Sequence, residues 1–181
     1  MRVGIAGVGG IGSNVAVNLV RSGVTKFTIA DFDTVEISNL NRQFYFEDQI
    51  GQPKVAMLIE NLLRIDPNVD IKVFPERLDN MNIVDVFSDC SIIVEGFDGS
   101  GDKKMLLESF AGDARPVISA SGIAGSGVDT LSSRRLGNCC IAGDFTTDCK
   151  DAKLYAHKVI AVAAIMTDKI LTECGHYNGK E

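Results

Sequence analysis

The sequence predicts an α/β protein with a Rossmann-like, mostly parallel sheet, helices on both of its faces and an antiparallel extension near the C-terminus. Short apolar runs alternate with helical patterns along the chain, and the first run stops in a cluster of glycines that opens a helix. This strand–helix order implies right-handed crossovers between parallel strands. With 181 residues, 45% of them apolar, the chain has the size and composition of one globular domain.

The expected elements follow in chain order. Strands are expected where apolar residues run together, at 2–6, 26–30, 71–74, 91–94 and 116–119. Helices are expected where apolar residues recur at helical spacing, at 12–21, between 52 and 67, at 83–87 and at 103–110. Gln52-Pro53 marks the start of the second helix, because proline is tolerated in a first turn.

The last third of the chain differs in character. Residues 128–136 suit an antiparallel strand, and 137–152 are expected to be a loop holding three of the five cysteines. The closing helix, 153–174, is apolar on most sides, which is typical of a helix buried in a core or a subunit interface. We therefore expect one domain over 1–174, a frayed tail over 175–181, and a symmetric homodimer.

Composition excludes several classes of partner. The net charge of −6 argues against a nucleic-acid or anionic-membrane surface, since phosphate binding needs a basic face. The longest apolar run, Val159 to Met166, is far shorter than the roughly 20 residues that cross a bilayer. Five cysteines without a CxxC pair indicate free thiols in a reducing cytoplasm. A cytoplasmic protein that binds neither nucleic acid nor membrane is expected.

The strongest local signal is the glycine loop Gly7-Val8-Gly9-Gly10-Ile11-Gly12, between the first strand and the first helix. Gly7 permits a tight turn, Gly9 lets backbone approach a phosphate, and Gly12 packs helix on strand. Gly7, Gly9, Gly10 and Gly12 are therefore candidate nucleotide-binding residues. The spacing does not choose between a dinucleotide and ATP.

Two carboxylates follow the second strand. Asp31 lies 19 residues beyond Gly12, where a carboxylate reaches the ribose hydroxyls of a nucleotide bound at the glycine loop. Asp33 is a second candidate in the same turn, although a solvated strand end explains it at least as well. NAD-dependent and ATP-dependent enzymes share this feature.

The residues that follow favour ATP. Arg42 and Lys54 can neutralise charge that develops on the β- and γ-phosphates, and Asn39 can supply a neutral hydrogen-bond donor. A dehydrogenase has no need of these three side chains after its second strand. Taken singly, Arg42 and Lys54 are equally well explained as surface residues.

Three segments, GVGGIGSN, DFDTVEISNLNRQ and GQPK, together resemble the ThiF/MoeB/HesA family of the ubiquitin-activating enzyme superfamily over residues 1 to about 122. The chain length and the segment AGDFTTDCKDA resemble the short ThiF-like proteins of thiamine biosynthesis. The resemblance implies an adenylyltransferase that uses ATP and Mg²⁺. Its expected partner is a small ubiquitin-like sulfur carrier, ThiS-like, whose C-terminal Gly-Gly carboxylate becomes an acyl-adenylate as pyrophosphate is released.

The resemblance also implies roles for individual residues. Asp31 would hold the ribose, and Asp98, at the end of the fourth strand, would hold Mg²⁺. The carboxyl ends of parallel strands border the ligand crevice, which suits both assignments, although Asp98 also fits a helix N-cap. The side chains implied to grip the phosphates are Asn39, Arg42, Gln43 and Lys54. Arg42, Lys54 and Asp98 are the expected catalytic residues.

The chain departs from the family pattern in two respects. Larger relatives carry two CxxC pairs that hold zinc; here Cys139 and Cys140 are adjacent and rarely could both ligate one tetrahedral ion, so no zinc is expected. An N-terminal arginine arm is also missing, and Arg134 and Arg135 are candidates to replace it. Cys149 is a candidate sulfur-handling thiol, although a free loop cysteine is the simpler interpretation.

Two alternative functions stay open on the sequence alone. An NAD(P)-dependent oxidoreductase accounts for the glycine loop and Asp31, but leaves Arg42, Lys54 and Asp98 without a role. A degenerate module that binds ATP or the carrier without turnover is favoured only by the missing arginine arm.

Overall fold

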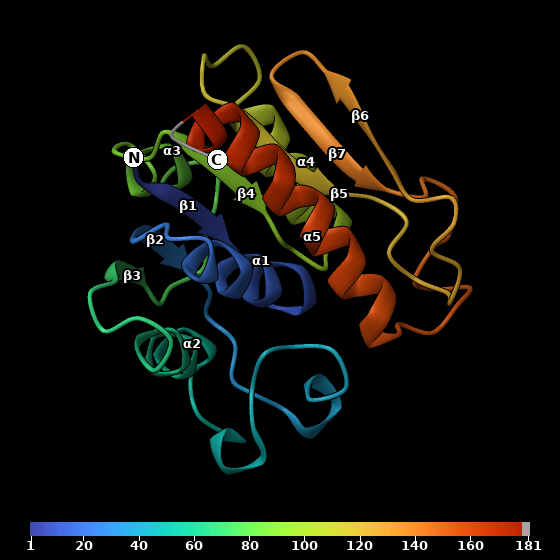
Figure 1. Cartoon of the computed structure of the whole chain (residues 1–181), viewed down its shortest axis with the longest axis horizontal. Coiled ribbons are helices and arrows are strands. Elements are labelled where there is room, and N and C mark those ends of the chain that lie inside the picture. Colours follow the sequence, from blue (N-terminus) through green and yellow to red (C-terminus); the bar gives the residue numbers. More distant parts are fainter. Residues whose placement is uncertain (179–181) are drawn as a thin grey trace.

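A seven-stranded sheet of order β3-β2-β1-β4-β5-β7-β6 runs through the centre of the computed structural model, which describes residues 1–178 (Figure 1). All neighbouring strands are parallel except the β6–β7 pair. The strands are β1 Val3–Ala6, β2 Lys26–Ala30, β3 Asp70–Phe74, β4 Ile92–Glu95, β5 Val117–Ala120, β6 Ser132–Leu136 and β7 Cys139–Gly143.

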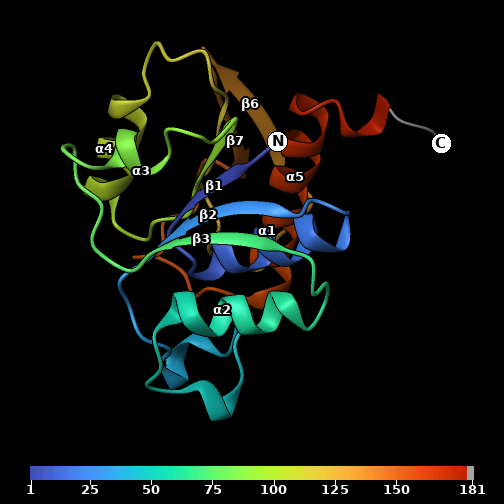
Figure 2. The same ribbon diagram turned by 90° about the vertical axis from the view of Figure 1, so that its left-hand side faces the viewer.

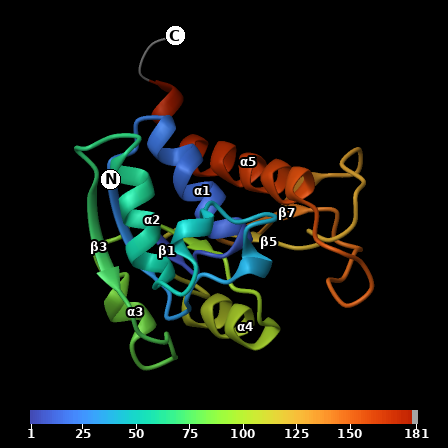
Figure 3. The same cartoon turned by 90° about the horizontal axis from the view of Figure 1, so that it is seen from below.

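Helices cover both faces of this sheet. Helices α1, α2 and α5 lie on one face, and α3 and α4 lie on the other (Figures 2 and 3). Right-handed crossovers produce this division, because the chain moves outward from β1 to β3 and then returns to β4 and β5. The helices are α1 Gly10–Arg21, α2 Lys54–Leu63, α3 Ile83–Val86, α4 Ser100–Ser109 and α5 Ala156–Glu173, with short 3₁₀ turns η1 Ile37–Asn39, η2 Glu47–Gln49 and η3 His176–Asn178. The fold class expected from the sequence is confirmed.

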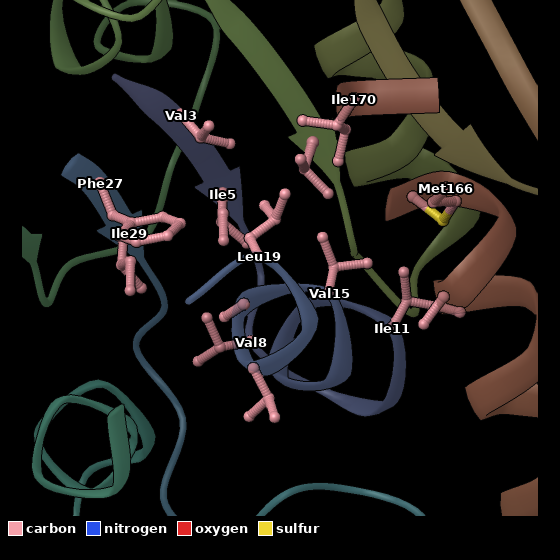
Figure 4. Close-up of a cluster of buried hydrophobic side chains, with 14 of the residues drawn as sticks. Val3, Ile5, Val8, Ile11, Val15, Leu19, Phe27, Ile29, Met166 and Ile170 are labelled. Carbon is pink, nitrogen blue, oxygen red and sulfur yellow. The ribbon is translucent and has the colours of Figure 1, made fainter. Parts of the chain in front are cut away.

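The main core lies between the sheet and the α1–α2–α5 layer. Side chains of β1 and β2 meet those of α1 and α5 there, as Figure 4 shows for Ile5, Val15, Leu19 and Met166. All four residues of β1 are buried, which explains why it reads as an unbroken apolar run. A second, smaller cluster fills the space under α3 and α4.

The C-terminal third differs from the sequence prediction. Residues 137–152 were expected to be a loop, but 139–143 form β7, a buried strand parallel to β5. The antiparallel strand expected at 128–136 begins only at Ser132, and the helix expected from 153 begins at Ala156 because Tyr155 is still extended. Within the expected tail, η3 occupies His176–Asn178, and 179–181 lie outside the described residues.

Helix α5 is amphipathic rather than buried on all sides. Val159, Val162 and Met166 are fully buried, whereas Ile160 is 45% exposed. The buried side of α5 packs on α1 in the main core. A homodimer built on its exposed side stays a prediction. No helix within residues 1–178 is long and apolar enough to span a membrane.

Candidate functional site

Two adjoining cavities lie at the carboxyl ends of the central strands. The first has a volume of about 120 Å³ and is lined by the glycine loop and the turns after β2, β3 and β4. The second has a volume of about 520 Å³ and is lined by the segments after β4, β5 and β7. Gly96, Phe97 and Asp98 line both. Strand order reverses between β1 and β4, so the cavities occupy the topological switch point where ligands bind in open α/β sheets.

The glycine loop has the geometry that its spacing predicts. Gly7 has a φ of 84°, which permits the tight turn out of β1. A Cβ on Gly12 would lie 1.9 Å from the carbonyl oxygen of Gly7, so only glycine allows this helix–strand contact. Gly7 and Gly9 line the first cavity, whereas Gly10 and Gly12 line neither cavity. Gly10 packs beside the Arg42 side chain instead.

Asp31 joins the end of β2 to the glycine loop. Its Oδ2 accepts a hydrogen bond from the Val8 amide at 2.7 Å, and its Oδ1 accepts one from the Asp33 amide at 2.8 Å. Burial raises the pKa of Asp31 above its ordinary value, although these two amides and the Lys54 ammonium oppose that rise. The carboxylate lines the first cavity beside the backbone that would meet a phosphate, which suits the ribose role.

Lys54 lies at the wall of the same cavity. Its Nζ lies 2.9 Å from Asp33 Oδ2, and its side chain is 6% exposed while that of Asp33 is 50% exposed. Two backbone hydrogen bonds, from Lys54 to Asp33 and from Val35 to Gln52, hold the start of α2 beside the turn after β2. The segment thus places a buried cation at the first cavity, and its carboxylate partner is half exposed and partly screened by solvent.

Arg42 lies on the second cavity and is anchored by the first turn of α1. Asn14 Nδ2 donates to the carbonyl oxygens of both Gly10 and Arg42, at 2.7 and 2.8 Å. Ser13 Oγ donates to the Gly9 carbonyl and accepts the Phe44 amide. These bonds fix the Arg42 segment directly against the glycine loop.

Asn39 and Gln43 are both buried but differ in whether their side-chain oxygens have hydrogen-bond partners. Asn39 is buried, its Oδ1 accepts the Glu36 amide at 3.0 Å, and it lines neither cavity. Gln43 is also buried, and a Cβ on Gly9 would lie 3.6 Å from its Nε2. Its Oε1 has no hydrogen-bond partner among the described residues, so the side chain has capacity for a polar ligand or water. Phosphate binding by either residue stays a prediction.

Asp98 is the carboxylate common to both cavities. It is exposed just after β4, and a Cβ on Gly9 would lie 3.8 Å from each of its oxygens. Within residues 1–178 no three His, Cys, Asp or Glu side chains gather as a metal site. Asp98 fits a Mg²⁺ ion that takes its other ligands from triphosphate oxygens and water, as this ion commonly does.

Three residues without a role in the sequence motifs hold the site together: Tyr45, Ser13 and Asn14. Tyr45 is buried, and its hydroxyl donates to the Val8 carbonyl at 2.8 Å. Burial raises the pKa of Tyr45, so the phenol stays protonated and keeps this bond. Two features of the sequence could have pointed to these residues: a tyrosine between two phenylalanines, and two polar residues near the start of an otherwise apolar helix.

Cys149 is exposed and lines the second cavity, but its environment does not activate it. Partial burial and the nearby carboxylates of Asp148 and Asp98 raise the pKa of its thiol. A thiolate is the nucleophilic form, so the structure favours an unreactive loop cysteine. Cys139 and Cys140 are buried in β7. The absence of zinc stays a prediction.

Arg134 and Arg135 both belong to β6 and line neither cavity. Arg135 forms an ion pair with Glu173, and the guanidinium of Arg134 lies 4.1 Å from the centre of the Phe145 ring. They reach neither cavity of their own chain, and their replacement of an arginine arm stays a prediction.

Comparison with known proteins identifies the family. The family model described as "ThiF family" matches residues 1–177. The chain belongs to the ThiF family. It is 28% identical to the molybdopterin-synthase adenylyltransferase of Salmonella typhimurium over 97% of this chain and 74% of that protein. It is 38% identical to ubiquitin-like modifier-activating enzyme 5 of Culex quinquefasciatus over 66% of this chain, but spans only 30% of that longer protein. The adenylyltransferase names among these ThiF relatives match the enzyme class expected from the sequence.

Solved structures of low sequence identity confirm the ThiF fold. The tRNA N6-threonylcarbamoyladenosine dehydratase of E. coli, in complex with ATP, superimposes with a TM-score of 0.80 at 16% identity, covering 97% of this chain and 87% of that one. MccB of E. coli superimposes with a TM-score of 0.77 at 19% identity, covering 97% of this chain and 56% of that one.

Proposed function

We propose that this ThiF-family protein transfers AMP from ATP to the C-terminal carboxylate of a small ubiquitin-like carrier protein. The observation that carries the proposal is the pair of adjoining cavities with Asp98 in both, Lys54 in the first and Arg42 in the second. The first cavity, with the glycine loop and Asp31, takes the nucleotide. The second takes the acyl partner, and the α-phosphate lies where the two meet.

In the proposed reaction a carboxylate oxygen of the carrier attacks the α-phosphorus of ATP in line. A new P–O bond forms, the bond from the α-phosphorus to the α,β-bridging oxygen breaks, and pyrophosphate leaves with that electron pair. A carboxylate is already ionised at neutral pH, so no general base is needed. Arg42 and Lys54 stabilise the developing negative charge, and Mg²⁺ held by Asp98 would neutralise charge on the leaving group.

Two observations support a carrier protein as the acyl partner: the names of the relatives and the net charge of this chain. Among the relatives are molybdopterin-synthase adenylyltransferase and ubiquitin-like modifier-activating enzyme 5, whereas one structural neighbour is a tRNA dehydratase. The net charge of −6 disfavours a tRNA substrate, because phosphate-backbone binding needs a basic surface. We therefore propose that the acyl partner is a protein carrier ending in Gly-Gly. The first candidate is a ThiS-like sulfur carrier of thiamine biosynthesis. The active form of this chain is proposed to be a homodimer.

An adenylating enzyme also explains the site better than a degenerate binding module or an NAD(P) oxidoreductase does. The fit of Lys54, Arg42 and Asp98 around the two cavities suits triphosphate chemistry, which neither alternative requires. Tight NADH binding in place of ATP binding would instead favour the oxidoreductase.

The test is carrier-dependent exchange of labelled pyrophosphate into ATP. The protein is incubated with ATP, Mg²⁺, pyrophosphate and purified Gly-Gly carriers of the thiamine and molybdopterin types, and with total tRNA in a separate arm. Carrier-dependent exchange is expected for the wild-type protein and for Asp85→Asn, at an exposed position of α3 outside both cavities, and its loss is expected for Asp98→Asn. Exchange with tRNA alone, or with no acceptor, would reject the carrier proposal.

A further inference from the structure

Residues 145–149, in the loop between β7 and α5, form one wall of the second cavity, and a buried ion pair holds the start of this loop. Asp144 Oδ2 lies 2.7 Å from Lys158 Nζ, and the two side chains are 5% and 2% exposed. Lys158 belongs to α5, which packs firmly into the main core. Because a buried charge without a partner is costly, the pair fixes Asp144 relative to that helix.

Asp144 also organises the residues that follow it. Its Oδ1 accepts the amides of Thr146 at 2.8 Å and Thr147 at 2.9 Å, and its Oδ2 accepts the Thr147 hydroxyl. Between them Phe145 has a φ of 64°, a left-handed conformation that a bulky residue keeps only where its surroundings impose it. Phe145, Thr146 and Thr147 all line the second cavity, so Asp144 determines the shape of that wall.

Lys158 also holds the adjoining wall through the same ammonium group. Its Nζ donates to the carbonyl oxygen of Ala124, directly after Ser121, Gly122 and Ile123, which line the cavity. The loops after β5 and after β7 lie side by side in Figures 1 and 3, and the Gly125 amide donates to the Lys153 carbonyl at 2.8 Å. One buried cation therefore connects both walls.

The two loops touch at positions where only glycine fits. A Cβ on Gly122 would lie 2.0 Å from Asp144 Oδ1, and one on Gly143 would lie 1.7 Å from the Ser121 carbonyl oxygen. Both glycines have positive φ angles. A shift of Asp144 would thus be transmitted directly to the wall formed by Ser121 and Gly122.

We propose that Lys158 and Asp144 are positioning residues that set the shape of the second cavity for the acyl partner and leave the nucleotide site unchanged. The inference rests on the proposed function, in which this cavity receives the carboxylate end of the carrier. The nucleotide side is independent of the pair, because Asp31 is anchored by the Val8 amide, and Lys54 is anchored by Asp33. Neither Lys158 nor Asp144 lines the first cavity.

The kinetic test separates positioning from general loss of stability. Asp144→Asn and Lys158→Met should each raise the KM for the carrier by at least about tenfold, because small misplacements of a reacting group are costly, while the KM for ATP changes by less than about twofold. A purely structural role would lower the amount of active enzyme and leave both KM values unchanged. Thr147→Val, which removes one hydrogen bond to Asp144, is the milder variant if either of the others fails to fold.

Arg115→Met provides the matched control. Arg115 forms a partly buried ion pair with Asp113 at 2.7 Å before the start of β5, away from both cavities. This variant also loses an ion pair, and it should leave both KM values unchanged. A rise in the carrier KM in Arg115→Met equal to that in Asp144→Asn would overturn the inference.

Backbone hydrogen exchange gives a readout that needs no carrier. Asp144→Asn should accelerate exchange in 121–125 and 144–149 while β1 and α1 keep their protection. Failure of every carrier with the wild-type protein would contradict the proposed function, and the exchange pattern would still decide whether the pair holds the two walls. Unchanged exchange in these segments, or equal increases of both KM values, would overturn the inference.

Discussion

Gly9 lies where the glycine loop faces the first cavity, and its replacement by alanine separates ligand binding from folding. A Cβ at this position would lie 3.6 Å from Gln43 Nε2 and 3.8 Å from both carboxylate oxygens of Asp98, which is ordinary van der Waals contact. The φ of −74° is accessible to alanine, but the ψ of −143° lies outside the β and α regions that alanine favours. The protein without nucleotide should therefore still fold with Gly9→Ala, with a loss of about 1–3 kcal/mol in the free energy of unfolding from backbone strain.

Nucleotide binding should respond much more strongly. The added methyl group occupies the space between Gln43 and Asp98 through which a phosphate would approach the backbone amides. Loss of one charge-assisted hydrogen bond costs about 1.5–3 kcal/mol. Since 1.4 kcal/mol is tenfold in affinity, the dissociation constant for ATP should rise by about 10- to 100-fold.

Calorimetric titration with a non-hydrolysable ATP analogue, paired with urea unfolding, measures both effects. Gly101→Ala in α4 is the matched control, because a Cβ there meets no atom within 4 Å and Gly101 lines neither cavity. Gly12→Ala is the opposite case and should destabilise the fold itself, since its Cβ would overlap the Gly7 carbonyl. Unchanged ATP affinity in a stably folded Gly9→Ala protein would refute phosphate binding at this loop.

Three further predictions concern the charges around the cavities. Lys54→Met removes the buried cation beside Asp33 and should weaken ATP binding at least about tenfold in the same titration; an unchanged affinity would remove Lys54 from the nucleotide site. Asp98→Asn should keep metal-free ATP binding but lower Mg²⁺-dependent pyrophosphate exchange by about 10²- to 10³-fold, and a loss below threefold would contradict its metal role. Burial opposes ionisation of Asp144, but Lys158 and the loop donors lower its pKa well below the ordinary value of 3.8. At a pH near or below that value the folded state therefore binds fewer protons than the unfolded state, so acid lowers the free energy of unfolding. In urea unfolding the wild-type protein should lose more stability than Asp144→Asn as the pH falls from about 5 to 3. Parallel curves of stability against pH for the two proteins would contradict this.

The parts of the site that the sequence predicted are those formed by local chain geometry. The turn at Gly7, the contact at Gly12 and the position of Asp31 each depend on one strand, one turn and the start of one helix. Such spacing is visible in the sequence, because a strand must end before the loop and a helix must begin after it. The parallel sheet could be predicted for the same reason, because strand and helix patterns alternate along the chain.

The parts that sequence did not predict depend on contacts between distant segments. Strand β7 has the sequence Cys-Cys-Ile-Ala-Gly, which carries no alternation, and it becomes a strand because β5 offers it a parallel edge. Tyr45 reaches the Val8 carbonyl across 37 residues of sequence. No local pattern distinguishes a tyrosine that closes such a bond from one that fills a core.

Arg42 and Lys54 show how one segment can serve two cavities. The sequence predicts that both bind phosphates, and in the structure Lys54 lines the first cavity and Arg42 lines the second. Each is anchored separately, Lys54 by backbone pairing with the turn after β2 and Arg42 by Asn14 of α1. Both anchors are contacts within the chain itself, so the two segments are positioned before any ligand arrives. Because preorganised charges need no reorganisation as the reaction proceeds, this division favours transfer at the boundary that Asp98 shares with both cavities.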